Sequence, residues 1–223
     1  MKNSMIVTLG LAALTVGEAL FSTAQAEVLK LELPEPYFGG TPLDYFGENL
    51  EEPNYKPRPD YEVPAGTTNV AKGKKVTSSV EKPEYGKFEF LTDGDKSYEN
   101  KSLLGLAKGL QWVQIDLGEV NNIYALTFWH FHEGDRVYFD VVVRVADDAA
   151  FTKNVRDIYN NDHDDSSKLG KKGKDQEYIE SYKARFVPVK DTKARYIRFY
   201  SNGSTHDEFN HYVEAEVFAK PAK

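Results

Sequence analysis

The chain has 223 residues and no cysteine, and its 28 basic and 35 acidic side chains give a formal net charge of −7. This acidic balance argues against a nucleic-acid-binding protein, which would present a basic surface, and against adhesion to an anionic membrane. The lack of cysteine excludes disulfides, thiolate metal sites and cysteine nucleophiles. The length suits one domain with extensions, or two small domains.

The first 26 residues have the pattern of a signal peptide. Lys2 precedes an apolar run over residues 5–16, and Ala24-Gln25-Ala26 provides the small side chains of a cleavage site. We therefore predict a mature chain that begins at Glu27, spans no membrane and is exported to a periplasm, a cell surface or the medium. An uncleaved N-terminal anchor is the alternative. A cysteine-free exported chain suits a bacterial envelope.

Residues 27–66 form a proline-rich arm that contains seven of the ten prolines. Proline fixes φ and lacks a backbone donor, so we expect an extended segment that is neither a helix nor a central strand. The arm also carries aromatic side chains that could dock on a surface with little loss of entropy. Three alternatives stay open: the arm folds back on its own domain, is disordered, or docks on a partner protein. The residues expected to dock are Tyr37, Phe38, Tyr45 and Phe46.

Residues 67–219 alternate short apolar or period-two runs with turn residues, and a short tail follows at 220–223. Such a pattern predicts an all-β sandwich or jelly roll. One helical turn is conceivable at 147–151. The predicted strands are 74–79, 88–91, 111–117, 122–131, 138–146, 155–159, 184–189, 194–201 and 211–219.

Five segments of this domain follow a known order: NVAKGKKVTSS, LTDGDKS, WVQIDLGEVNNIYALTFW, ARYIRFYSNGS and YVEAEVFA. In this order the domain resembles the discoidin family, also called the coagulation factor V/VIII C-type domain, among the galactose-binding-like jelly rolls. The whole chain resembles secreted bacterial discoidin-domain proteins with a proline-rich arm. The resemblance implies a jelly-roll sandwich that binds glycans, phospholipids or proteins through loops at one end. Members are generally not catalytic.

No catalytic motif stands out from the sequence. A GxSxG elbow, an HExxH helix and a phosphate-binding loop are absent, and no carboxylate pair is marked as a glycosidase dyad. We therefore expect that the protein is not an enzyme.

The Asp93-Gly94-Asp95 turn is the strongest metal signal in the sequence. Two carboxylates that flank a glycine turn can converge on a hard cation such as calcium. The resemblance implies a structural calcium held by this turn and by Glu214, with Glu216 as the second choice. The alternative is a turn capped by its own aspartate.

The polar stretch 160–175 is a second candidate metal site. Asp162, Asp164 and Ser166 are spaced as in the first half of an EF-hand loop, but the required glycine and glutamate are missing. The lysines that follow at 168–174 would repel a cation. We expect a surface loop, ordered by bonds between aspartate or asparagine side chains and its own backbone. A looser calcium site is the alternative.

The candidate ligand-binding residues lie in two polar and aromatic segments. In a strand, Trp129 and Phe131 would point one way and His130 and His132 the other. A sugar needs an aromatic face and planar hydrogen-bonding groups, which these segments offer. The alternatives are a core position with histidines at the sheet rim, a zinc site missing its third ligand, and a plain loop at 202–211. The candidates are Trp129, His130, His132, Arg136, Tyr138, Asn202, His206 and His211.

Together these features predict a non-catalytic exported module that binds carbohydrate or an envelope polymer. A different possibility is an accessory subunit of a periplasmic or surface assembly, docked through the arm. A sugar site should leave Trp129, His132, Arg136 and the 202–211 loop clustered and open. A docking subunit should leave the arm projecting from the domain.

Overall fold

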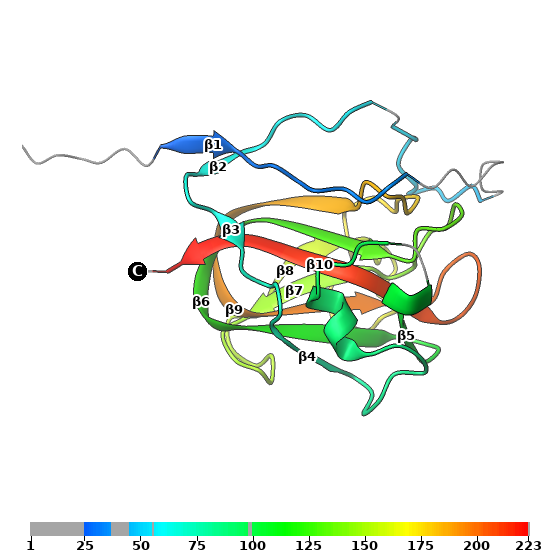
Figure 1. Ribbon diagram of the computed structural model, residues 1–223. Coiled ribbons are helices and arrows are strands. Elements are labelled where there is room, and N and C mark those ends of the chain that lie inside the picture. The colour runs from blue at the N-terminus through cyan, green and yellow to red at the C-terminus, as the bar shows by residue number, and fades with distance from the viewer. Residues whose placement is uncertain (1–24, 37–44, 55, 98–99, 223) are drawn as a thin grey trace, which may run out of the picture.

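The computed structural model describes residues 25–36, 45–54, 56–97 and 100–222, which are mostly antiparallel strands and their loops (Figure 1). The main sheet runs in the order β3-β10-β6-β9-β7-β8, with β4 added to β6 and β5 added to β10. Its strands are β3 (Thr68–Asn69), β4 (Lys75–Ser78), β5 (Leu104–Leu106), β6 (Gln111–His130), β7 (Val142–Ala146), β8 (Arg156–Asn160), β9 (Arg185–Ser201) and β10 (Asn210–Pro221). The jelly-roll sandwich expected from the sequence is confirmed.

Two long bent strands join the layers of the sandwich. The first half of β6 pairs with β4 and with the second half of β9, whereas its second half pairs with β10 and the first half of β9. The register breaks between Asp116 and Asn121, where Gly118 has a φ of 88° and donates its N–H to the Asp116 carboxylate. A glycine is needed there because other residues rarely adopt a positive φ. Each long strand therefore contributes to both layers.

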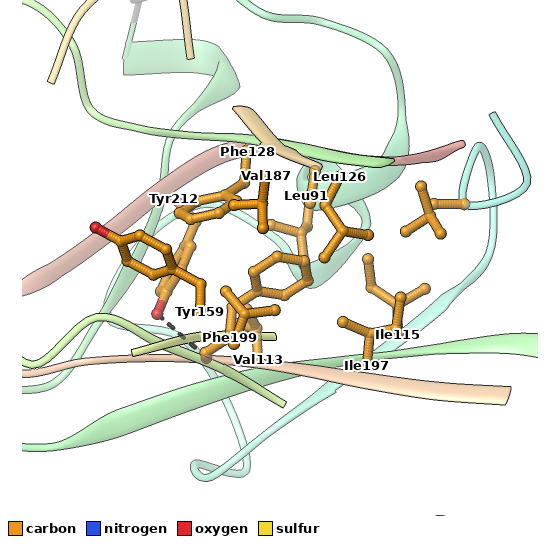
Figure 2. Close-up of a cluster of buried hydrophobic side chains, with 14 of the residues drawn as sticks. Leu91, Val113, Ile115, Leu126, Phe128, Tyr159, Val187, Ile197, Phe199 and Tyr212 are labelled. Carbon is orange, nitrogen blue, oxygen red and sulfur yellow. Dashed lines mark hydrogen bonds between the residues drawn. The ribbon is translucent and has the colours of Figure 1, made fainter. Parts of the chain in front are cut away.

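The core lies between the two halves of these strands (Figure 2). Val113, Ile115 and Phe199 come from one layer, and Leu126 and Phe128 come from the other. All five side chains are at most 1% exposed. Alternation along each strand places these side chains inward and their polar neighbours outward.

Several predicted boundaries differ from those in the structure. The strand predicted at 88–91 is a 3-10 helix, η1 (Phe88–Thr92), whose apolar side chains pack down from a helical turn. The strand predicted at 138–146 begins only at Val142, because Asp140 has a φ of 50°, which extended backbone does not allow. Residues 147–151 form turns and bends without a helix. A second 3-10 turn, η2 (Asn100–Ser102), precedes β5.

The described parts of the arm fold back on the domain. Strand β1 (Ala26–Val28) pairs with β2 (Glu62–Pro64), and the Leu29 N–H donates to the Tyr61 carbonyl. Further along, Leu50 forms a parallel bridge with Glu177. Among the described residues, no helix is long and apolar enough to cross a membrane.

Candidate functional site

Five side chains lie close together, four of them in loops and His211 at the start of β10. We call them the end cluster: Tyr85, Phe131, Arg136, His206 and His211. The Tyr85 ring is 42% exposed and lies 5.9 Å from the His211 ring, measured between centroids. The Arg136 guanidinium stacks on Phe131 at 4.6 Å. The cluster thus combines an open aromatic ring with planar nitrogen groups.

Backbone contacts fix the position of the exposed ring. Tyr85 forms an isolated antiparallel bridge with Gly105 of β5. The Gly105 N–H donates to the Tyr85 carbonyl, and the Glu84 N–H donates to the Gly105 carbonyl. A side chain at Gly105 would overlap the Tyr85 ring, since an added Cβ would lie 2.2 Å from it. Glycine at this position allows the aromatic ring to lie flat against β5.

His211 is neutral at pH 7. Burial lowers its pKa to about 4, and the nearby charges of Arg136, His130 and His206 act in the same direction while Asp207 opposes them. Its Nδ1 lies 3.0 Å from the Tyr138 hydroxyl, and the Tyr138 side chain is itself buried. A neutral imidazole can both donate and accept a hydrogen bond. Such a group suits a hydroxyl-rich ligand.

Arg136 is only 6% exposed, and its Nη2 donates to the carbonyl of Glu133. Its Nε has no partner among the residues that the structure describes. A buried N–H donor without an acceptor costs free energy. A ligand or water oxygen that accepts from Nε would therefore bind more favourably.

Trp129 and His132 lie elsewhere, on the outer face of the β6–β10 layer. Trp129 is fully buried, donates its indole N–H to the Tyr182 carbonyl and lies under the Lys96 ammonium at 5.3 Å. His132 is 3% exposed and contacts the Lys96 carbonyl through Nε2 at 3.0 Å, so that nitrogen carries the proton. Neither ring is open in the way that the sugar-site prediction requires.

His130 points into the core and not toward the rim of the sheet. Its Nδ1 lies 3.1 Å from a Glu180 oxygen, and its ring stacks on Tyr138 at 4.3 Å between centroids. Both members of the His130–Glu180 pair are almost fully buried. This pair ties the segment that carries Glu180 to the interior of the sandwich.

Asn202 belongs to a third place, beside the 160–175 loop. It donates to Asp140, whose carboxylate also accepts from Ser166. Oxygens of Asp140, Asp162 and Asp164 lie within 4.8 Å of one another. The buried Asp162 carboxylate accepts from the backbone N–H groups of Ser166 and Ser167. Internal bonds therefore order this loop, as the sequence suggested, and the looser calcium site there stays a prediction.

The Asp93-Gly94-Asp95 turn packs against Glu214, and the Asp95 N–H donates to the Asp93 carboxylate, which is the alternative of a turn capped by its own aspartate. The calcium site there stays a prediction. The Gly94 N–H donates to Glu214 Oε2 at 3.0 Å, while Oε1 has no partner among the described residues. Burial is the main cause that raises the pKa of Glu214 to about 9. Glu216 is instead neutralised by Lys96 at 2.8 Å and bonded to Thr127. The unpaired buried oxygen of Glu214 fits a cation ligand, whereas Glu216 already has its cation.

The four arm aromatics expected to dock on a partner have different positions. Tyr45 is bound within the molecule, because its hydroxyl donates to Glu177 at 3.0 Å and its ring packs edge-on against Phe139. Phe46 is 90% exposed. Tyr37 and Phe38 lie outside the described residues. A partner at Phe46 stays a prediction.

Sequence reasoning missed Tyr85, Glu180 and Asp140. Tyr85 stands in a turn-rich segment, EKPEYGK, where a lone exposed aromatic was the available signal. Glu180 and Asp140 gave no local signal, because their partners are 50 and 62 residues away in the chain. Only the fold brings these groups together.

No protein-family model matches the chain, and no curated protein matches it. Its fold is similar to part of a family 89 glycoside hydrolase from Clostridium perfringens solved with 2-acetamido-1,2-dideoxynojirmycin. That match has a TM-score of 0.50 and 17% identity, and it covers 69% of this chain. It spans only 15% of the hydrolase chain.

Two smaller solved structures are also similar. The CBM32 of AlyQ, in complex with 4,5-unsaturated mannuronic acid, has a TM-score of 0.48 and 17% identity, over 65% of this chain and 93% of its own. The lectin domain of lectinolysin, complexed with Lewis B antigen, has a TM-score of 0.47 and 18% identity, over 69% of this chain and 97% of its own. At these identities the likeness bears on the fold alone.

Proposed function

We propose that this chain is a non-catalytic, exported module that binds carbohydrate through the end cluster. The single observation that carries the proposal is the open Tyr85 ring beside His211, with the stacked Arg136–Phe131 pair next to it. Solved modules of similar fold that were crystallised with sugars support it. Fold alone does not fix function, so the argument depends on these side chains.

The chemistry of the end cluster matches a sugar ring. An aromatic face takes the apolar C–H side of a pyranose, and planar polar groups take its hydroxyls. Tyr85 supplies the face, His211 and the exposed His206 supply imidazole nitrogens, and Arg136 supplies a donor. Tyr85 and His206 are exposed, so a polymer end or branch can approach these two side chains, whereas His211 and Arg136 are only 5% and 6% exposed.

We also propose a structural calcium at the Asp93-Gly94-Asp95 turn. Glu214 would be its buried carboxylate ligand, since its Oε1 has no partner in the part of the chain that the structure describes. The calcium would fix the turn to β10. Lys96 forms its ion pair with Glu216, so the Glu214 carboxylate remains available to the cation.

An array of bacterial and host glycans tests the proposed function. Fluorescently labelled exported protein should bind a small set of glycans, and the free glycan should compete with an excess. Tyr85→Ala should weaken binding up to about tenfold, because stacking contributes ~0.5–1.5 kcal/mol beyond buried area. Phe46→Ala, a change at an exposed aromatic of the arm, is the matched control and should bind as the parent does. Equal binding by the Tyr85 variant would refute the site.

A further inference from the structure

An apolar groove lies between the arm and the domain, separate from the end cluster. Its volume is about 380 Å³. Beyond β1 and β2 the two segments of the arm separate over the sandwich (Figure 1), and the groove opens between them. Its walls are Leu29, Leu31, Leu33, Pro57, Arg58, Pro59, Asp60, Tyr61, Tyr182, Lys183 and Phe186.

The apolar wall is continuous and partly open to solvent. Leu29, Leu31 and Leu33 are two residues apart, and in an extended chain such residues share one face. Leu33 is 43% exposed. Tyr61 and Phe186, which also line the groove, pack edge-to-face at 5.2 Å between ring centroids. A groove of this size and lining is in the range of small-ligand sites, which are about 300–1,000 Å³.

Arg58 places a positive charge in this apolar surface. Its guanidinium lies 5.0 Å above the Phe186 ring, and its Nη2 donates to the carbonyls of Lys183 and Ala184. No carboxylate pairs with Arg58 among the described residues, although Asp60 lies on the exposed rim. Burial and, secondarily, the nearby charge of Arg185 lower the pKa of Arg58. An anion is the complementary charge.

The shape of the walls argues against a peptide strand as the occupant. A strand added to a sheet edge needs backbone donors on that edge. Pro57 and Pro59 lack them on one wall, and Pro34 and Pro36 lack them where the other wall continues. A ligand that needs contact area and one salt bridge, but no backbone ladder, fits better.

We propose that this groove binds a single-chain amphiphile with a carboxylate head, such as a medium-chain fatty acid. The alkyl chain would lie along the leucine row against Phe186. The carboxylate would accept one charge-assisted hydrogen bond, from Arg58 Nε or Nη1, because Nη2 already donates to two carbonyls. Among the described residues, no hydrogen-bond acceptor is recorded for Nε or Nη1.

Isothermal titration of the exported protein with laurate, below its micelle concentration, tests this proposal. Dodecanol and dodecyltrimethylammonium have the same alkyl chain with a neutral and a cationic head. We expect laurate to bind about tenfold more tightly than dodecanol, because a charge-assisted hydrogen bond contributes about 1.5–3 kcal/mol. The ammonium compound should bind no better than dodecanol.

Three variants test the charged part and the apolar part of the groove, and a fourth tests its independence from the end cluster. Arg58→Met should remove the preference for laurate, and Arg58→Lys should restore part of it. Leu33→Ala, at an exposed position that threatens the fold little, should weaken laurate and dodecanol alike. Tyr85→Ala should change neither, so this outcome is independent of the proposed sugar site. Each variant is first checked for a parental unfolding midpoint.

Two results would overturn the proposal. One is laurate binding that Arg58→Met and Arg58→Lys leave unchanged. The other is an unacylated apolar peptide that displaces laurate and binds more tightly, which would make the groove a peptide site.

Discussion

His211 connects the chemistry of the end cluster to a measurable pH dependence. Its folded-state pKa of about 4 is below the ordinary value of 6.5, so the unfolded chain binds the extra proton first. The contribution to stability is therefore complete above pH 6.5 and is lost as pH falls toward 4. We expect a loss on the order of 3 kcal/mol over that window, measured as the free energy of unfolding in urea.

A pair of histidine variants isolates this effect. His211→Gln should flatten the stability profile between pH 6.5 and 4, whereas the exposed His206→Gln should leave the slope as in the parent protein. The charges that face His211 are those of Asp207, Arg136, His130 and His206, so each variant is measured at constant ionic strength. An unchanged slope in His211→Gln would disprove the assignment.

Glu214 gives the second prediction at the residue scale. Calcium should raise the unfolding midpoint by several degrees, because a ligand that binds only the folded state stabilises it. Glu214→Gln keeps the shape of the side chain but cannot ionise to bind the cation, so the calcium response should disappear. Differential scanning calorimetry with calcium, magnesium and chelator measures this. A full calcium response in Glu214→Gln would show that the cation does not bind at this turn.

At the scale of single elements, the 160–175 loop is ordered from within. Asp162 is 1% exposed and accepts two backbone N–H groups as well as the Ser167 hydroxyl. Asp162→Ala should cost about 2–3 kcal/mol of unfolding free energy, because buried donors would lose their acceptor. The exposed Asp164→Ala is the control and should cost less than about 1 kcal/mol. Equal costs would mean that the loop does not depend on Asp162.

The sequence predicted the strands well but not what covers them. Period-two alternation correctly places Trp129 and His130 on opposite sides of β6. It does not reveal that the outer side is covered too, by Lys96, Tyr182 and Leu103 on the Trp129 side. An aromatic strand residue therefore suggested a ligand platform where the structure has a second small core.

At the scale of the whole molecule, the order of motifs was enough to predict the sandwich but not the position of the arm. Hydrophobic runs specify strands, and the order of the five motifs indicated the jelly-roll fold. The arm depends on long-range contacts, such as Arg185 with Glu51 at 2.7 Å and Tyr45 with Glu177, which leave no periodic trace in the sequence. The loop-end residues likewise meet only after the sandwich forms.

The most direct test of the proposed sugar site is a nuclear magnetic resonance titration of the isotope-labelled protein with a glycan from the array. If the end cluster binds the glycan, the largest shift changes are expected at Tyr85, Phe131, Arg136, His206 and His211. Small changes are expected at Trp129 and His132, which are covered, and at the groove residues Leu31 and Phe186. Changes centred on Trp129 or on the groove, with the end cluster unaffected, would contradict the proposed site.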